Sequence, residues 1–270
     1  MGPGITHPHW LTTMSDKPTV FVAILAKEKA ATLPFYLETL NNWDYPKDRI
    51  HIYIRTNNNT DETEDILNDW VRQYGSQYMS VLMDYTDVPH DLESLGVHEW
   101  TSLRFSVLAS IRRKSIQMAR QINADYYFVS DVDNYLFSHT LSAMVETGVS
   151  AVSPMLHYAN GEDEAPRAYS NFHNEANEYG YYKDNPAYFD IIEQKIKGLI
   201  AVDVMHCTYL LHKDILDQCD YFDGTEDYEY VIFSRILRDR GIQQYLDNRE
   251  IYGYLTLTEN AGACRTRMGM

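Results

Sequence analysis

The feature that most constrains the fold is the regular alternation of strand-like and helix-like segments over the first half of the chain. Short apolar runs are followed each time by a polar turn and a segment with apolar residues at helical spacing. The expected strands lie at 19–26, 51–56, 79–85 and 125–134, and the expected helices lie at 33–43, 65–75 and 101–122. This order predicts an α/β fold in which a mostly parallel central sheet carries helices on both faces. Ligands of such sheets bind at the carboxyl ends of the strands.

In the second half of the chain the expected strands and helices no longer alternate regularly. Further strands are expected at 151–156, 205–212, 243–247 and 251–257, with one helix at 226–241. The stretch 157–190 is rich in Tyr and Asn and has weak periodicity, which is typical of an ordered loop or a ligand-binding insertion. The 270 residues contain no internal repeat and no linker, so we expect a single domain over 19–262. Residues 1–18 are expected to be a flexible tail or residues left by cloning, and 263–270 a C-terminal tail.

The formal net charge of −16 restricts the ligands that this chain can attract. An acidic surface repels phosphate backbones and anionic lipids at long range, so nucleic acid is not an expected partner. If the ligand is itself an anion, the protein must supply positive charge locally, and a bound cation does so most simply.

No targeting segment or membrane span is visible in the sequence. The opening residues lack a basic start followed by an apolar stretch, and no run approaches about 18 apolar residues. We therefore expect a cytoplasmic protein as the sequence stands, and a luminal one only if a leader has been removed. Cys207, Cys219 and Cys264 are too few and too far apart for a zinc cluster or a disulfide framework, so free thiols are expected.

Two carboxylates at the end of the fourth expected strand are the strongest chemical signal. Asp131-Val132-Asp133 follows the β-rich run DYYFV, and strand side chains alternate with a period of two, so both carboxylates are expected on one side. Paired carboxylates are hard oxygen ligands suited to Mg²⁺ or Mn²⁺. A cation held there would bridge the two phosphates of a nucleotide ligand. Taken alone, the pair fits a solvated strand end equally well.

A second acidic pair, Glu226 and Asp227, opens the expected helix 226–241. Acidic residues in the first turn stabilise a helix through its dipole, so N-terminal capping explains them equally well. A carboxylate in this position could also deprotonate an acceptor hydroxyl as a general base, provided that it stands apart from the metal pair.

Basic and imidazole side chains could complete the site. Arg104 and Arg112 are eight residues apart on the expected helix 101–122, which puts them roughly on one face just before the metal strand. For most of the basic residues of this helix a solvated face is the favoured reading. His206 lies in an apolar strand, where a hydrogen-bonded core histidine is the default and a ligand role is the alternative.

With these segments in hand, the chain resembles the amino-terminal glycosyltransferase domain of the procollagen galactosyltransferases and related viral and bacterial enzymes, which have the GT-A fold. The matching pieces follow one another over nearly the whole chain, from about residue 19 to 256. They are FVAILAKEKAATLPFYLETLNNWDYPKDRI, TNNNTDET, EWTSLRF, ARQINADYYFVSDVDN, SPML, YSNFH, GYY, VMHCTYLL and IYGYL. Such an ordered set is far more specific than any single motif.

The resemblance implies a nucleotide-binding first half. The residues near the uridine of a UDP-sugar would be Ala26, Lys27, Glu28, Asn57 and Asp61. Asp131 and Asp133 would hold the metal, with Mn²⁺ favoured over Mg²⁺. Arg104, Arg112 and Val132, which lies between the two acids, complete the expected nucleotide site.

The resemblance also implies an acceptor side in the second half. The TEDYEY segment looks like the acidic base motif of inverting enzymes, with Asp227 as the first choice of base and Glu226 as the second. The insertion at 157–190, with its YSNFH segment, and His206 would face the sugar or the acceptor. The tail after IYGYL contains no His, so the third metal ligand is His206, water or absent.

The leading interpretation is a metal-dependent, inverting transfer of galactose or glucose from a UDP-sugar to a hydroxyl acceptor on a protein or glycan, with hydroxylysine of a collagen-like chain as one acceptor. A degenerate domain that binds a nucleotide-sugar or glycan without turnover is the first alternative. A phosphohydrolase is a weaker one, because that class places its acidic motif after the first strand. A homodimer is kept open as the oligomeric state.

Overall fold

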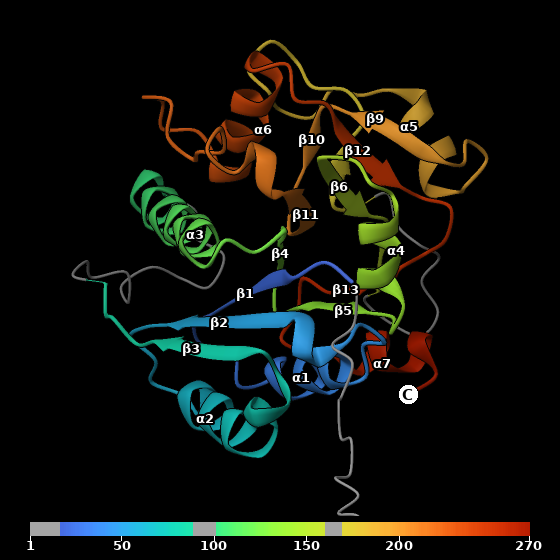
Figure 1. The fold of residues 1–270 in the computed structure, drawn as a ribbon. Helices are drawn as coiled ribbons and strands as arrows, with labels where there is room; N and C mark the ends of the chain where they lie inside the picture. Colours follow the sequence, from blue (N-terminus) through green and yellow to red (C-terminus); the bar gives the residue numbers. More distant parts are fainter. Residues whose placement is uncertain (1–16, 89–100, 160–168) are drawn as a thin grey trace, which may run out of the picture.

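A central sheet of eight strands, in the order β3-β2-β1-β4-β11-β6-β12-β9, organises the chain (Figure 1). The computed structural model describes residues 17–88, 101–159 and 169–270. The strands of this sheet are Val20–Ala26 (β1), Ile50–Thr56 (β2), Ser80–Asp84 (β3), Tyr126–Ser130 (β4), Ala151–Pro154 (β6), Leu199–Val202 (β9), Thr208–His212 (β11) and Gln244–Asp247 (β12). All run in one direction except β11 and β9, which are antiparallel to their neighbours. The predicted mostly parallel sheet is confirmed.

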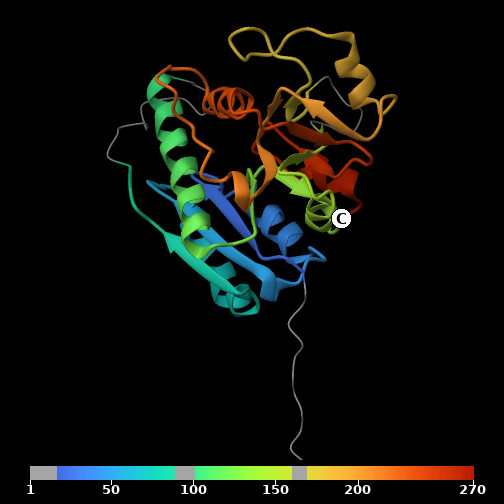
Figure 2. The same cartoon turned by 45° about the horizontal axis from the view of Figure 1, so that its top comes forward.

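Helices cover both faces of this sheet, as predicted. They span Leu33–Asn41 (α1), Thr63–Tyr74 (α2), Ser102–Ile122 (α3), Thr140–Glu146 (α4), Pro186–Ile192 (α5), Glu229–Asp239 (α6) and Gly262–Met268 (α7). Buried side chains of α1, α2 and α4 share one core with the sheet, whereas those of α3 and α6 share a second core on the opposite face. Figure 2 shows α3 running alongside the strands of the N-terminal half.

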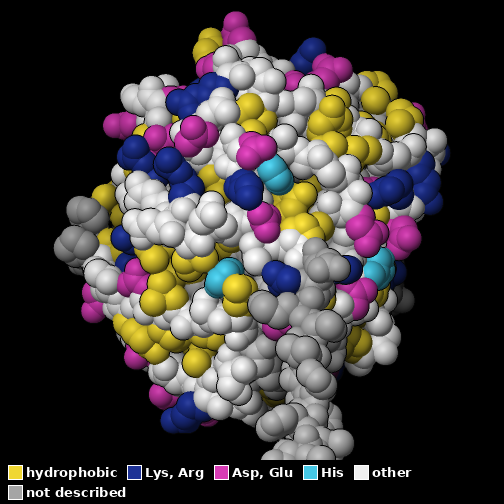
Figure 3. Space-filling model, in the orientation of Figure 1, with side chains coloured by type: hydrophobic (Ala, Val, Ile, Leu, Met, Phe, Trp, Pro, Cys, Tyr) yellow, Lys and Arg dark blue, Asp and Glu magenta, His cyan; other side chains and the backbone are white. Residues whose placement is uncertain are grey.

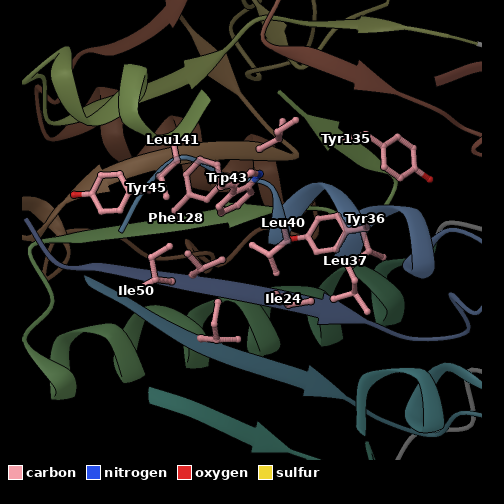
Figure 4. Packing of buried hydrophobic residues seen from close by; sticks show 14 of the residues in the cluster. Ile24, Tyr36, Leu37, Leu40, Trp43, Tyr45, Ile50, Phe128, Tyr135 and Leu141 are labelled. Atoms are coloured by element: carbon pink, nitrogen blue, oxygen red, sulfur yellow. The ribbon is translucent and has the colours of Figure 1, made fainter. Parts of the chain in front are cut away.

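Strand β1 shows how the sequence builds the two cores. Its side chains alternate, so that Val20, Val22 and Ile24 enter the first core while Phe21 and Ala23 enter the second. A strand that is buried on both faces needs apolar residues at every position, and the sequence of β1, VFVAILA, is such a continuous apolar run. Figure 4 shows the first core.

The aromatic packing on β4 gives a stability prediction. Phe128 is fully buried, and its ring meets that of Trp43 edge-on with centroids 5.6 Å apart. Replacing Phe128 by Ala should lower the free energy of unfolding by about 3–5 kcal/mol, because it removes a large apolar side chain and leaves a cavity. Urea denaturation measures the change. Leu82→Ala on the edge strand β3, where the side chain is 39% exposed, is the control and should cost less than about 1 kcal/mol. An equal loss of unfolding free energy in Phe128→Ala and Leu82→Ala would contradict the buried position of Phe128.

The second half adds smaller layers that the sequence predicted only in part. Asn134–Leu136 (β5), Leu156–Tyr158 (β7) and Gly253–Leu255 (β13) form a sheet of three strands, and Phe172–His173 (β8) pairs with Val204–Met205 (β10). Helices α4 and α5 and strand β9 were not predicted. Each of these helices has only seven residues, too few to show a clear helical period.

The expected insertion at 157–190 has a core of its own. Phe172 of β8 and Tyr188 of α5 pack with Met155, Val202 and Leu246, so this region is anchored to the far edge of the main sheet. Residues 160–168 of the insertion, like residues 1–16 of the expected N-terminal tail, lie outside the described residues.

The last residues of the chain form helix α7. Cys264 of this helix is fully buried in the first core, and the Arg265 guanidinium lies 4.3 Å from the centre of the Phe35 ring. Residues expected as a tail thus pack onto α1. All three cysteines are free thiols, as the sequence predicted.

Candidate active site

The loops that follow β1 and β2 are fastened to each other by hydrogen bonds. The Glu28 amide donates to Asn59 Oδ1 at 3.0 Å, and the Ala30 amide donates to Asp61 Oδ2 at 3.0 Å. Glu28 adopts a left-handed backbone conformation, with φ of 52°, which turns the chain toward the second loop. Because β1 and β2 are parallel, the two loops meet at one edge of the sheet and form a fixed platform.

The other residues expected near the uridine lie at the same edge. Ala26 is the last residue of β1 and is buried, and Lys27 follows it half-buried. Asn57 comes directly after β2, is buried, and donates from Nδ2 to Asn58 Oδ1 at 3.0 Å. The structure therefore brings together at one edge of the sheet the five residues that the family resemblance places near the uridine.

Asp61 has a structural task in this platform that can be tested by pH. Burial raises the pKa of Asp61, but hydrogen bonds from Thr63 and from the Ala30 amide outweigh it, and the net shift is below the ordinary value of 3.8. A lowered pKa in the folded state adds stability that is present above pH 3.8 and is lost as the pH falls through the folded pKa. Asp61→Asn should therefore lower the free energy of unfolding by about 1 kcal/mol at pH 7, and the difference from wild type should shrink below about pH 4. Urea titrations of both proteins at pH 7 and pH 3 measure this difference in unfolding free energy. A difference that does not change with pH would contradict the structural role of the Asp61 carboxylate.

Asp131 and Asp133 lie in a turn just past β4, at the centre of the sheet. The strand ends at Ser130, and the Asn134 amide donates to the Asp131 carbonyl at 2.9 Å, which closes the turn. The prediction that strand alternation aligns the two carboxylates is therefore wrong in its reason, because the pair lies beyond the last strand residue. Val132 between them is buried in the first core, so only its backbone is available to a ligand.

Each carboxylate of the pair is matched by one basic side chain. Arg112 Nη2 lies 2.8 Å from Asp131 Oδ1, and Lys29 Nζ lies 3.4 Å from Asp133 Oδ2 and 3.2 Å from Glu259 Oε1. Burial, and next the charge of Asp131, raise the pKa of Asp133 to about 6. The two carboxylates of the turn therefore lie close enough for the charge of Asp131 to act on Asp133.

The position of this turn in the sheet matters for ligand binding. Chain order runs outward from β1 to β2 and β3, then returns to β4 on the other side of β1. The chain leaves β1 and β4 toward opposite edges of the sheet. The gap between their carboxyl ends is therefore a topological switch point, where open α/β sheets bind their ligands. Lys29 from the loop after β1 meets Asp133 from the turn after β4 across this point.

The donor set at the pair suits a magnesium or manganese ion that is shared with a ligand. In the described parts of the chain no three His, Cys, Asp or Glu side chains are grouped closely enough to hold a metal by themselves. Mg²⁺ is commonly held by one or two protein carboxylates, with water and substrate phosphates as the remaining ligands. Asp131 and Asp133 fit that arrangement, and they do not fit an all-protein cage.

His206 lies in an aromatic environment rather than in a group of three metal ligands. It is buried, its Nδ1 is 2.9 Å from Cys207 Sγ, and its ring centroid is 5.0 Å from that of Tyr230. Burial lowers the pKa of His206 to about 3, with smaller contributions from His173 and Arg112. The imidazole is therefore neutral at physiological pH, a state that suits either a core histidine or a ligand.

The second acidic pair lies before helix α6. The helix begins at Glu229, so the prediction that Glu226 and Asp227 occupy its first turn is wrong. Asp227 is held in the preceding segment instead, because Oδ1 accepts from the Tyr181 hydroxyl at 2.7 Å and Oδ2 accepts from Arg235 Nη2 at 2.9 Å. Burial raises the pKa of Asp227, but these hydrogen bonds outweigh it and the net shift is downward.

A cavity of about 300 Å³ lies between the first turns of α3 and the segment that leads into α6. Its lining includes aromatic rings and carboxylates, those of Phe105, Tyr221, Phe222, Glu226, Asp227 and Glu229. Both candidate bases therefore border the same cavity. Glu226 is exposed there, whereas Asp227 is half-buried.

Helix α3 separates its basic residues into two groups. Arg112 is buried and points to Asp131, whereas Arg113, Lys114 and Arg120 are exposed, as the solvated-face reading predicted. Arg104 is half-buried in the first turn, and its amide donates to the capping Thr101 hydroxyl at 3.3 Å. The structure thus brings Arg112, and not the whole basic face, to the acidic pair Asp131 and Asp133.

Charged side chains elsewhere are mixed in sign. Figure 3 shows basic and acidic groups interspersed over the face of the molecule seen in Figure 1. None of the helices described by the structure combines the length and the apolar character needed to cross a membrane.

Known proteins resemble this chain at the level of family and fold. The model of glycosyltransferase family 25, N-terminal domain, matches residues 17–265. Procollagen galactosyltransferase 2 of Mus musculus is 35% identical over 251 residues, which are 90% of this chain and 39% of that protein. The inactive glycosyltransferase 25 family member 3 of Homo sapiens is 28% identical over 252 residues, covering 90% of this chain and 41% of that protein. The chain thus spans about two fifths of the length of these relatives.

Solved structures share the fold at low sequence identity. The S. aureus TarS fragment 1-349 matches with a TM-score of 0.56 at 14% identity, over 88% of this chain and 60% of that one. The mannosyltransferase PcManGT from Pyrobaculum calidifontis, in complex with GDP-Man and Mn²⁺, matches with a TM-score of 0.57 at 13% identity, over 93% of this chain and 60% of that one. These likenesses support the predicted GT-A glycosyltransferase fold.

Proposed function

Because the chain belongs to glycosyltransferase family 25, we propose that it transfers galactose or glucose from a UDP-sugar to a hydroxyl group of a protein or glycan acceptor. The name of the mouse relative, a procollagen galactosyltransferase, favours galactose as the sugar. It also makes hydroxylysine in a collagen-like chain the first acceptor to test.

The observation that carries this proposal is the acidic turn at the switch point of the sheet. Asp131 and Asp133 face the carboxyl ends of β1 and β4, and the platform built by the loops after β1 and β2 lies beside them. A nucleotide on the platform would place its diphosphate next to the two carboxylates. A divalent cation, Mn²⁺ or Mg²⁺, held there would supply the positive charge that an acidic protein lacks.

The side chains around the pair would orient it for this task. Arg112 fixes the position of the Asp131 carboxylate, and Lys29 does the same for Asp133. Lys29 links Asp133 to Glu259 from the C-terminal segment, so it would also hold that segment near the donor. His206 stays a candidate either for the third ligand or for contact with the donor sugar.

The acceptor would enter the cavity between α3 and α6, where its hydroxyl would meet Asp227 or Glu226. In an inverting transfer, Asp227 takes the proton from that hydroxyl while the oxygen attacks the sugar from the face opposite the leaving diphosphate. The Tyr181 hydroxyl and the Arg235 guanidinium hold Asp227 in place. Each oxygen of Asp227 accepts one hydrogen bond in the structure, so a carboxylate lone pair is left to accept the proton of the acceptor hydroxyl.

A second candidate is a domain that binds a nucleotide-sugar without transferring it. Two observations favour it: one relative is described as inactive, and the hydrogen bonds that Asp227 accepts lower its pKa, which makes it a weaker base. Such a domain would retain the platform and the acidic turn.

Measuring UDP release across a panel of nucleotide-sugars with Mn²⁺ separates the two. We expect release with UDP-galactose or UDP-glucose, raised further by hydroxylysine peptides in a subsequent acceptor panel. Calorimetry that detects UDP-sugar binding, beside no release with any donor or acceptor, would replace the transferase with the binding domain.

A further inference from the structure

Glu229, the first residue of α6, is buried, and its carboxylate faces the guanidinium of Arg112. We propose that Glu229 is a positioning residue that shares the charge of Arg112 and thereby leaves Asp131 available to a divalent cation. This inference rests on the proposed function, because it concerns the same acidic turn. It gives a role to a residue that lies outside both acidic pairs of the sequence.

The three side chains form a chain of ion pairs that crosses from the sheet to α6. Arg112 Nη2 is 2.8 Å from Asp131 Oδ1, and Arg112 Nε is 3.5 Å from Glu229 Oε1. The side chains of Arg112 and Glu229 are only 10% and 8% exposed, whereas that of Asp131 is 28% exposed. The Asp131 carboxylate is therefore the more accessible of the two.

Burial makes the distribution of charge within this chain important. A guanidinium shielded from water needs nearby negative charge, and its attraction to a carboxylate is stronger than in solvent. With Glu229 present, two carboxylates divide the attraction of Arg112. Without Glu229, the whole attraction falls on Asp131, which would then bind Arg112 at the expense of a cation.

One atom of Arg112 supports a site that is incomplete without a ligand. Nη1 is shielded from solvent and has no hydrogen-bond partner among the residues that the structure describes. A buried donor without a partner is costly, so a ligand oxygen or a water is expected beside it. Glu229 would fix the plane of the guanidinium and so the direction of this donor.

The same contact links the two halves of the site. Glu229 lines the cavity between α3 and α6, and through Arg112 it reaches the acidic turn at the end of β4. A purely structural role, in which the ion pair only fastens α3 to α6, would change stability. It would not change the affinity for metal.

The test measures Mn²⁺ affinity by calorimetry at saturating UDP in Glu229→Gln, Arg112→Gln and the double variant, with the melting temperature of each. Gln keeps the shape of Glu229 and removes its charge. We expect Glu229→Gln to bind Mn²⁺ about 10–100-fold more weakly, the usual effect of losing a residue that orients a metal ligand. In the Arg112→Gln background, Glu229→Gln should have little further effect. Arg113→Gln is the matched control, because Arg113 pairs with Asp220 on the exposed side of the same helix, and it should leave Mn²⁺ affinity unchanged.

Unchanged Mn²⁺ affinity in a folded Glu229→Gln variant would overturn the inference, and so would an equal loss in both backgrounds. If Glu229→Gln does not fold, Arg112→Lys decides, because Lys keeps the charge but cannot reach both carboxylates; full Mn²⁺ affinity there would also overturn it. Failure of the wild-type protein to bind Mn²⁺ and UDP would instead count against the proposed function itself.

Discussion

Replacing Asp131 and Asp133 together by Asn is expected to lower the rate of Mn²⁺-dependent UDP release about 10³-fold or more, because the loss of both acidic ligands removes several kcal/mol of charge stabilisation. Asn keeps the size of each side chain while removing its charge. The rate is measured with saturating UDP-sugar and acceptor, over a range of Mn²⁺ concentrations.

A surface variant with the same loss of charge provides the control. Asp69 and Asp214 are 68% and 75% exposed in their side chains, so Asp69→Asn with Asp214→Asn removes two charges away from the turn. This variant should keep wild-type activity. Full activity in the Asp131 and Asp133 double variant would contradict the assignment, and so would an equal loss in the surface variant.

Replacing Asp227 by Asn is expected to lower the turnover number about 10²–10⁴-fold, the usual contribution of a general base. Asn can still accept a hydrogen bond from Tyr181, so the segment before α6 should stay in place. Binding of UDP with Mn²⁺ should therefore be unchanged, since Asp227 borders the cavity between α3 and α6 and is not part of the acidic turn.

Glu226→Gln is the matched variant, because Glu226 is the neighbouring acid of the same cavity and is exposed. We expect it to keep most of the activity. A large loss in Glu226→Gln beside an active Asp227→Asn would transfer the role of base to Glu226. Full activity in both variants would remove the base from this segment altogether.

The N-terminal half of the fold could be predicted because local signals decide it. The buried strand β1 is a continuous apolar run and β4 is nearly one, and α2 carries a clear apolar period. Strand order then places the loops after β1 and β2 at one edge. The shorter elements α4, α5 and β9 depend on contacts made elsewhere in the chain, and local periodicity does not reveal them.

The candidate site was predicted where it lies at strand ends and missed where it depends on distant pairs. Asp131 and Asp133 stand at the end of a recognisable strand. Lys29 is separated from Asp133 by 104 residues, and nothing in its own neighbourhood marks it as a partner. The family resemblance placed Lys27 of the same loop near the uridine, and the structure adds Lys29 as the residue in contact with the pair.

Glu229 and the partners of Asp227 were missed for a related reason. Glu229 lies two residues after the acidic pair Glu226 and Asp227. Only the three-dimensional packing of α3 on α6 brings it to Arg112. Tyr181 and Arg235 belong to the insertion and to α6, and only the fold brings both to Asp227. The residues around Arg112 in the sequence, SVLASIRRKSIQM, contain no acid, so the local sequence gives no signal for its pairing with Glu229.

The central claim is that Asp131 and Asp133 bind a divalent cation together with the diphosphate of the donor. Calorimetric titration of the wild-type protein with UDP, once with Mn²⁺ and once with a chelator, tests it most directly. We expect saturable binding with Mn²⁺ and a loss of at least about tenfold in affinity without it, which corresponds to about 1.4 kcal/mol. Equal affinity for UDP under both conditions, or no binding under either, would contradict the claim.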